Sequence, residues 1–327
     1  MKVCVVKTSS MGDVIHTLPA LTDAQKAIPD LHIDWVVEKG FSEIPLWHSA
    51  VNQVIEVKIR DWRKRLLQPQ MWQEWQRYKN QLQATQYDAI IDAQGLLKSS
   101  VLVTRLANGR RFGYDKKSAK EGLSSLFYNE KFSIDYQQHA VERIRQLFAK
   151  SLNYPVPQQR GDYGIAGRLM QKFANFSQDR TASSLPYIIA IHSTTRDNKH
   201  WLESYWVEII KQICSQNIEV HLPWGNPEEK LRAERLATIS SLVKVLPKWS
   251  LTELATHIAY SKAVISVDTG LSHLTASLDK LSVVLYGTTD PKLIGTYGKN
   301  QHHLYANSMA KITPSQVLET LRANNGI

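Results

Sequence analysis

Residues 2–13, KVCVVKTSSMGD, contain the pattern that decides the fold. An apolar run over residues 3–6 is followed at once by a polar loop that holds Gly12 and Asp13. A short, continuous apolar run is typical of a strand that is buried on both faces of a parallel sheet. In such a sheet the loop after the first strand lies at the carboxyl edge, where ligands bind. Cys4 lies inside the run, so we expect it to be a small buried side chain.

Similar apolar runs recur along the chain and alternate with helical patterns. Between the runs, apolar side chains return every three or four positions, for example within residues 71–82 and 141–152. Ser250 and Thr313 each stand three residues before Glu or Gln, which is the signature of a capped helix start. The alternation in both halves predicts two doubly wound α/β domains. The further predicted strands are residues 33–37, 89–92, 187–191, 218–222, 263–267 and 283–286.

The composition is that of an ordinary globular protein of two domains. The chain has 327 residues, 43% hydrophobic and 21% charged, which excludes a disordered chain, a collagen and a coiled coil. Its 40 Lys and Arg residues outnumber its 30 Asp and Glu residues, giving a formal charge of +10. This excess favours an anionic partner such as a nucleotide, a nucleic acid, a membrane surface or an acidic glycan.

Cysteine content and hydropathy indicate a cytoplasmic protein. The two cysteines, Cys4 and Cys214, are too few for a disulfide framework or a cysteine-based zinc site. The first residues lack the pattern of a signal peptide, and no run approaches the roughly 18 apolar residues of a spanning helix. We therefore expect a soluble, cytoplasmic protein and leave attachment to a membrane surface open.

The loop after the first strand is the first candidate site. Gly12 allows a tight turn, and Asp13 opens a helix whose N-terminal amides would face a ligand. Asp13 could equally be a helix N-cap and nothing more. The loop does not match the known phosphate cradles, because the chain contains neither G-x-G-x-x-G nor G-x-x-x-x-G-K-[ST].

Residues 192–201, HSTTRDNKHW, follow the predicted strand at 187–191 and form the second candidate site. The hydroxyls of Thr194 and Thr195, with Lys199 at the entrance to a helix, suit a phosphate. A solvated loop with an ordinary N-cap would have the same sequence.

Residues 266–273, SVDTGLSH, form the third candidate site at another strand-to-helix turn. Backbone amides, the Thr269 hydroxyl and His273 could bind an anion there, although a histidine at a helix start is often structural. The Asp-Thr-Gly triplet does not indicate an aspartic protease, because the chain has one such triplet in an α/β setting.

Residues 222–229, LPWGNPEE, form the fourth candidate site. Trp224 could flank a nucleobase, and Glu229 could accept hydrogen bonds from ribose hydroxyls. Complementation of the helix dipole explains the acidic residues equally well.

Two basic clusters in the N-terminal half favour an anionic ligand on that half, although charge runs are often solvated surface. The first surrounds Trp62 and comprises Lys58, Arg60, Arg63, Lys64 and Arg65. The second, to which no role is assigned, comprises Arg110, Arg111, Lys116, Lys117 and Lys120. No metal site is expected, because neither H-E-x-x-H nor Asp-x-Asp occurs.

Together these motifs resemble those of the bacterial lipopolysaccharide heptosyltransferases of glycosyltransferase family 9, above all the enzymes that add the first heptose of the inner core. The resemblance covers nearly the whole chain, in order and at family spacing. It rests on KTSSMGDVIHTLPALTDA, IDAQGLLKS, STTRDNKHW, LPWGNPEE and VDTGLSHLTASLD.

The resemblance implies a GT-B fold, in which two Rossmann-like, doubly wound α/β domains face a cleft. It places an acceptor-binding domain at residues 1–170 and a nucleotide-sugar domain at residues 171–312. A last helix, within residues 313–327, is expected to return to the N-terminal domain. The boundary falls between Tyr163 and Ser184, where Pro155, Pro157 and a polar stretch at 177–184 interrupt the regular pattern.

The resemblance also implies the reaction and its residues. The donor would be ADP-L-glycero-D-manno-heptose, the acceptor the Kdo disaccharide on lipid A, and the transfer inverting, without a metal or other cofactor. Asp13 matches the family's base, and Lys199 both catalyses and binds the donor. The other implied donor contacts are Thr194, Thr195, Trp224, Glu229, Asp268, Thr269, Gly270 and His273.

The acceptor's carboxylates and phosphates would give the first basic cluster a partner. The implied acceptor contacts are Ser10, Gly12, Arg60, Arg63 and Lys64. We expect a monomer held peripherally at the anionic inner face of the inner membrane. Two features depart from the family: Trp249 replaces a smaller side chain near the nucleobase, and Asp61 with Trp62 interrupts the basic loop.

Three other functions remain as alternatives. A heptosyltransferase that adds the second or a later heptose would share the donor site. An α/β nucleotide-binding dehydrogenase conflicts with the missing G-x-G-x-x-G motif. A nucleic-acid-binding module suits the charge but has no recognised binding motif, so we expect no nucleic-acid partner.

Overall fold

A computed structural model describes residues 1–172 and 185–327 of the chain. These fall into two compact units, Met1–Ile165 and Ala166–Ile327, so the division lies five residues before the predicted one at 170/171. The whole of the polar stretch at 177–184, at the predicted boundary, lies outside the described residues.

The first unit is built on a six-stranded parallel sheet with the order β3-β2-β1-β4-β5-β6. This is the strand order of the Rossmann fold, in which the order reverses between the first and fourth strands. The central strands are almost wholly buried, as their apolar runs predicted. The strands are β1 (Lys2–Val6), β2 (His32–Glu38), β3 (Val51–Val57), β4 (Gln86–Asp92), β5 (Asn108–Tyr114) and β6 (Glu130–Phe132).

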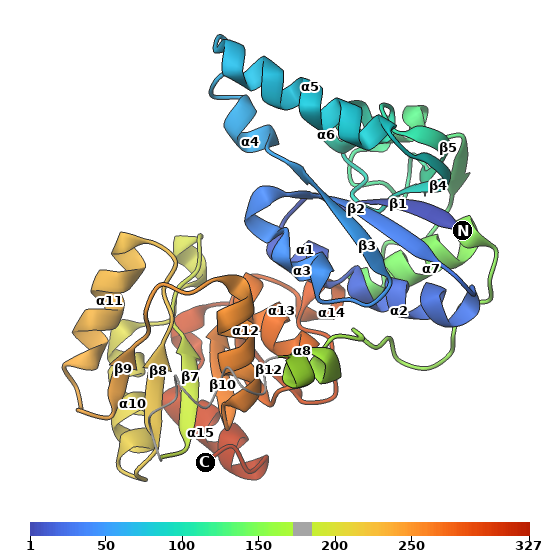
Figure 1. Ribbon diagram of the computed structural model, residues 1–327. Coiled ribbons are helices and arrows are strands. Elements are labelled where there is room, and N and C mark those ends of the chain that lie inside the picture. The colour runs from blue at the N-terminus through green and yellow to red at the C-terminus, as the bar shows by residue number, and fades with distance from the viewer. Residues whose placement is uncertain (173–184) are drawn as a thin grey trace. The chain divides into compact units, whose positions relative to one another are not determined.

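Helices cover both faces of this sheet (Figure 1). On one face α5 (Pro69–Gln83) buries Met71, Tyr78 and Leu82 against β1, β2 and β3, as its apolar spacing predicted. On the other face α2 (Leu18–Ala27) packs against α7 (Ala140–Leu152). The shorter helical elements are α1 (Met11–Ile15), η1 (Lys39–Phe41), α3 (Glu43–Leu46), α4 (Ile59–Trp62), α6 (Leu97–Ser99), η2 (Ser100–Thr104) and η3 (Gly122–Phe127).

The second unit repeats the same architecture. Its parallel sheet has the order β12-β11-β10-β7-β8-β9, so here the chain order reverses between β7 and β10. The strands are β7 (Tyr187–Ile191), β8 (Glu219–Leu222), β9 (Val243–Val245), β10 (Ala263–Val267), β11 (Ser282–Tyr286) and β12 (Gln301–Tyr305).

The helix starts predicted at Ser250 and Thr313 are confirmed. Asn226, Ser250 and Thr313 are the N-caps of α11, α12 and α15, and each side chain accepts a hydrogen bond from a backbone N–H three residues on. The helical elements are α8 (Ala166–Lys172), η4 (Asp197–Lys199), α10 (Glu203–Cys214), α11 (Pro227–Ala237), α12 (Leu251–Tyr260), α13 (Gly270–Ser277), α14 (Pro291–Ile294), η5 (Met309–Lys311) and α15 (Pro314–Ala323).

The last helix packs against elements of the second unit. The prediction that residues 313–327 return to the N-terminal domain stays a prediction. α15 packs against α10, β11 and β12. Val317 and Leu321 lie fully buried in the same core as Trp206 of α10. The Trp201 indole N–H also donates to the Ile312 carbonyl at 2.8 Å, which fixes the start of α15.

Candidate active site

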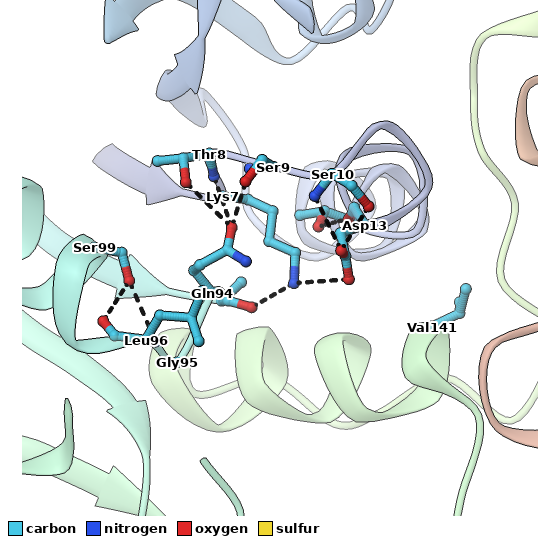
Figure 2. A network of polar contacts seen from close by, with 12 residues as sticks. Lys7, Thr8, Ser9, Ser10, Asp13, Gln94, Gly95, Leu96, Ser99 and Val141 are labelled. Carbon is cyan, nitrogen blue, oxygen red and sulfur yellow. Dashed lines mark hydrogen bonds and ion pairs between the residues drawn. The ribbon is translucent and has the colours of Figure 1, made fainter. Parts of the chain in front are cut away.

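The switch point of the first unit lies between the ends of β1 and β4. Lys7 leaves the end of β1, and its Nζ donates to the carbonyl of Ala93, just past β4, at 2.8 Å. The backbone N–H groups of Thr8 and Ser9 donate to Oε1 of Gln94 at 2.9 and 3.2 Å. Figure 2 shows this network binding the loop after β1 to the loop after β4. The polar residues are therefore gathered where ligands bind in folds of this kind.

Asp13 stands at the start of α1, beside this network (Figure 2). The N-cap of α1 is Ser10, whereas Asp13 occupies the third helical position, so the N-cap interpretation of Asp13 is wrong. One carboxylate oxygen of Asp13 accepts from the Ser10 N–H and hydroxyl, both at 3.0 Å. Its side chain is 37% exposed and can reach a ligand. Gly12, next to it, is buried within α1 itself, so the tight turn predicted at this glycine is wrong.

Lys7 lowers the pKa of Asp13. Its Nζ lies 3.8 Å from the second carboxylate oxygen of Asp13, and its own side chain is 7% exposed. Burial raises the pKa of Asp13, but the Lys7 ammonium and the two bonds from Ser10 outweigh it, so the net pKa lies below its usual range. Asp13 is therefore a carboxylate at neutral pH and is free to accept a proton.

Two further cations act on this site and were not predicted from the sequence as site residues. Lys120, from the second basic cluster, lowers the pKa of both Asp13 and Lys7. Arg143, on α7, also lowers the pKa of Lys7, and its guanidinium lies over the Tyr136 ring at 4.1 Å. No motif marks Arg143, because its place depends on how α7 crosses the sheet.

The switch point of the second unit brings together the second and third predicted sites. The loop after β7 meets the turn after β10: the Thr194 hydroxyl donates to the Asp268 carbonyl at 3.1 Å. The Lys199 ammonium forms an ion pair with the Asp268 carboxylate, and both side chains are largely buried. The sequence predicted both residues near a ligand, but not that they pair. Thr195, beside Thr194, is exposed.

The turn after β10 opens directly into α13. Thr269 is the N-cap of this helix, Gly270 is its first residue, and His273 is buried in its first turn. The first N–H groups of a helix have no partners within it and carry the positive end of the helix dipole. This helix start is therefore suited to an anion, next to the ammonium of Lys199.

His200 and Arg232 hold the loop that carries Thr194 and Lys199. An Nη of Arg232, on α11, donates to Nδ1 of His200 at 2.7 Å, and the other donates to the Trp201 carbonyl at 2.9 Å. Burial and the Arg232 guanidinium lower the pKa of His200, while hydrogen bonds to the loop backbone at Thr194 oppose this shift. A neutral His200 thus links α11 to the loop. The two residues lie 32 positions apart, so their pairing gave no signal in the sequence.

Trp224 and Glu229 lie at the end of β8, next to β7 in the sheet. The Trp224 indole N–H donates to the Leu246 carbonyl at 2.6 Å, which fixes the ring. The Glu229 carboxylate accepts from the N–H of Gly225 at 2.7 Å and from the Asn226 amide at 2.8 Å. Glu229 therefore stabilises the start of α11, as the structural interpretation of this residue predicted. Its carboxylate has acceptor positions left for further hydrogen bonds.

The first basic cluster divides into structural and exposed cations. Lys58 and Arg65 form ion pairs with Glu74 of α5, at 3.2 and 3.3 Å. Trp62 is 5% exposed and belongs to the core. The exposed cations, which follow β3, are Arg60, Arg63 and Lys64.

The second basic cluster divides as well. Arg110 pairs with Glu130, and the Arg111 guanidinium donates to the Asn129 amide oxygen at 3.1 Å. Both arginines therefore belong to the edge of the sheet at β5 and β6. Lys116 and Lys117 are exposed, and Lys120 acts on Asp13 as described above.

Residues 1–172 and 185–327 contain neither a metal-type cluster nor a membrane-spanning helix. No group of three or more His, Cys, Asp or Glu side chains lies together in the geometry of a metal site. None of the helices in this part of the chain is both long and apolar enough to cross a membrane.

Two Rossmann-like units, each with polar loops gathered at its switch point, define the class of GT-B nucleotide-sugar enzymes. The sequence model of "Glycosyltransferase family 9 (heptosyltransferase)" matches residues 75–320. The chain belongs to this family and is a glycosyltransferase, as its motifs predicted.

Similar proteins cover nearly the whole chain. Lipopolysaccharide heptosyltransferase 1 of Salmonella typhimurium is 53% identical over 99% of this chain and 98% of its own length. The protein of the same name from Pseudomonas aeruginosa is 47% identical over 93% of this chain and 83% of its own length. The solved structure of Escherichia coli heptosyltransferase WaaC with ADP is 52% identical, covers 99% of this chain and 100% of that one, and superposes with a TM-score of 0.93.

Proposed function

We propose that the protein transfers L-glycero-D-manno-heptose from ADP-heptose to the Kdo of Kdo2-lipid A, with inversion and without a metal. The names of its relatives support the first-heptose assignment. The solved WaaC structures with ADP and with ADP-2-deoxy-2-fluoro heptose support the donor. The proteins named lipopolysaccharide heptosyltransferase 2 match less of the chain, at 28% identity over 147 residues for one of them. Addition of a later heptose is therefore the second candidate.

Asp13 is the proposed base, and its geometry is the observation that carries the proposal. Inversion in a single displacement needs a group that takes the proton of the attacking hydroxyl. Asp13 is ionised, partly exposed and fixed at the switch point by Ser10 and Lys7. One oxygen is held by Ser10 and the other faces Lys7 at 3.8 Å, while the 37% exposure of the side chain leaves the carboxylate accessible to a hydroxyl.

The second unit supplies the groups that would stabilise the ADP leaving group. Negative charge develops on the diphosphate as the glycosidic bond breaks, and preorganised donors lower the energy of that state. Lys199, the hydroxyls of Thr194 and Thr195 and the start of α13 are such donors. The diphosphate would replace the Asp268 carboxylate as the partner of Lys199. The remaining proposed donor contacts are Trp224, Glu229, Thr269, Gly270 and His273.

The acceptor would meet the positive charge of the first unit. Kdo carboxylates and lipid A phosphates are anionic, and Lys120 and Arg143 add to the positive field around Asp13. Ser10 and Gly12 adjoin Asp13, and the exposed cations after β3 would bind more distant anionic groups. We also propose that the enzyme works as a monomer, in the cytoplasm, at the inner face of the inner membrane.

The test is release of ADP from ADP-heptose in the presence of EDTA. Two acceptors are compared: Kdo2-lipid A and the same acceptor already carrying one heptose. Turnover on the unheptosylated acceptor alone is the expected result. Turnover only on the heptosylated acceptor would make the second candidate correct, and loss of turnover in EDTA would refute metal independence.

A further inference from the structure

The connection between α4 and α5 carries an exposed apolar tip, made of Leu66, Leu67 and Trp72. Their side chains are 54%, 99% and 55% exposed. The Trp72 indole N–H donates to the Leu66 carbonyl at 3.0 Å, which fixes the ring to this connection. Isolated apolar side chains are common on protein surfaces, but a group that contains an almost completely exposed leucine indicates a partner.

The apolar tip stands on a rigid support. The Trp62 ring of α4 packs against Trp75 and Tyr78 of α5, with ring centroids 5.4 and 5.5 Å away. Its indole N–H donates to Glu74 at 3.2 Å. These contacts bind α4 to α5, and Figure 1 shows the connection between them at the end of α5 that is farther from β4. The apolar tip is thus presented in a fixed position.

The charge around the apolar tip is positive. Residues 58–74 hold five basic and two acidic side chains, a net charge of +3. Both acidic side chains, Asp61 and Glu74, pair with Arg65 inside the segment and offer little repulsion to an anionic surface. The exposed cations beside the apolar tip are Arg60, Arg63 and Lys64.

We propose that this apolar tip inserts into an anionic lipid bilayer, with the neighbouring cations on the headgroups. Leucine side chains enter the boundary between headgroups and acyl chains, where the amphipathic tryptophan ring also prefers to lie. Cations beside an anionic leaflet add attraction. A second copy of the chain is a poorer partner, because two such tips would repel each other. The inference rests on the proposed function in one respect: the bilayer is the one that holds the acceptor.

The test is co-sedimentation of the full chain with phosphatidylcholine vesicles, with and without phosphatidylglycerol. The variant is Leu66→Ser with Leu67→Ser, at positions that no proposed donor or acceptor contact uses. The matched control is Leu46→Ser with Leu231→Ser, because these leucines are 52% and 59% exposed elsewhere in the chain. Exposed positions keep the risk of unfolding low in both variants.

We expect the wild type and the control to bind the anionic vesicles, and weakly the neutral ones. The Leu66/Leu67 variant should lose about a hundredfold in partition coefficient, because each leucine contributes about tenfold. Leu67→Trp should keep or strengthen binding. Unchanged binding of the Leu66/Leu67 variant, or no vesicle binding by the wild type, would overturn the inference, as would a dimer in solution that this variant abolishes.

Turnover on a deacylated, water-soluble acceptor separates this inference from the proposed function. The Leu66/Leu67 variant should keep wild-type turnover there, while its KM for vesicle-embedded acceptor rises. Loss of turnover on the soluble acceptor would overturn the inference and place the leucines in the acceptor site. Failure of the wild type on every acceptor, with vesicle binding intact, would instead refute the proposed function alone.

Discussion

Replacing Lys7 with methionine should move the acid limb of the pH–rate profile to higher pH. The Lys7 ammonium lies 3.8 Å from the Asp13 carboxylate. At that distance two unit charges interact by about 1 kcal/mol in water and about 4 kcal/mol near a protein surface. Since Asp13 is 37% exposed, the lower part of this range applies. One pH unit corresponds to about 1.4 kcal/mol, so the limb should move up by about one unit.

The acid limb moves to higher pH because the ionised form of Asp13 is the one that reacts. Asp13 works as the ionised base, and Lys7 helps to lower its pKa, so the wild type keeps its activity into the acid range. Without the ammonium, Asp13 takes up a proton at higher pH. The assay is kcat/KM for ADP release from ADP-heptose, with a water-soluble acceptor, across the acid range.

Two controls make the Lys7 experiment decisive. Lys26→Met removes an exposed charge of the same unit and should leave the profile in place. Thermal unfolding shows whether loss of the Lys7 bond to Ala93 has damaged the fold. An acid limb that stays at the wild-type pH in folded Lys7→Met protein would refute the role of Asp13 or its coupling to Lys7.

Lys199→Ala should weaken donor binding and lower kcat about 10²–10³-fold, and unchanged steady-state kinetics would remove its ammonium from the diphosphate. Arg145→Ala should cost about 3–5 kcal/mol in urea unfolding, because Arg145 and Asp23 form a buried ion pair at 2.6 Å; a cost below about 1 kcal/mol would contradict this. Burial, and to a smaller extent the neighbouring His221, lower the pKa of His257 to about 3. Burial also lowers the pKa of His221. The contribution of these histidines to stability is therefore present above the unfolded pKa of about 6.5 and is lost as the pH falls towards 3. As the pH is lowered, the free energy of unfolding should decrease less steeply in His257→Gln than in the wild type. Equal slopes would show that protonation of His257 is not coupled to unfolding.

The sequence predicted the centre of each sheet but not its edges. The sequences that form β1, β4, β7 and β10 are continuous apolar runs, because helices cover both faces of those strands. β3 (VNQVIEV) and β12 (QHHLY) lie at sheet edges and carry polar side chains, so no apolar run marks them. β5 (NGRRFGY) was missed for the same reason, because its first half is polar.

The candidate site was predicted as separate loops rather than as pairs of residues. Ligand-type side chains after β1, β7 and β10 could be recognised, because the end of a parallel strand is a fixed place in the fold. The pairing of Lys199 with Asp268 depends on β7 lying beside β10, which only the strand order reveals. The burial of Trp62 could not be predicted, because its neighbours in sequence are charged, whereas its partners in space, Trp75 and Tyr78, are aromatic.

Turnover of Asp13→Asn, measured together with its affinity for ADP, decides whether Asp13 is the base. Asparagine keeps the size of the side chain and an oxygen for the bonds from Ser10, but it cannot take a proton. We expect the single-turnover rate to fall about 10²–10⁴-fold with ADP affinity unchanged. Near-normal turnover in this variant would contradict the assignment of Asp13 as the base.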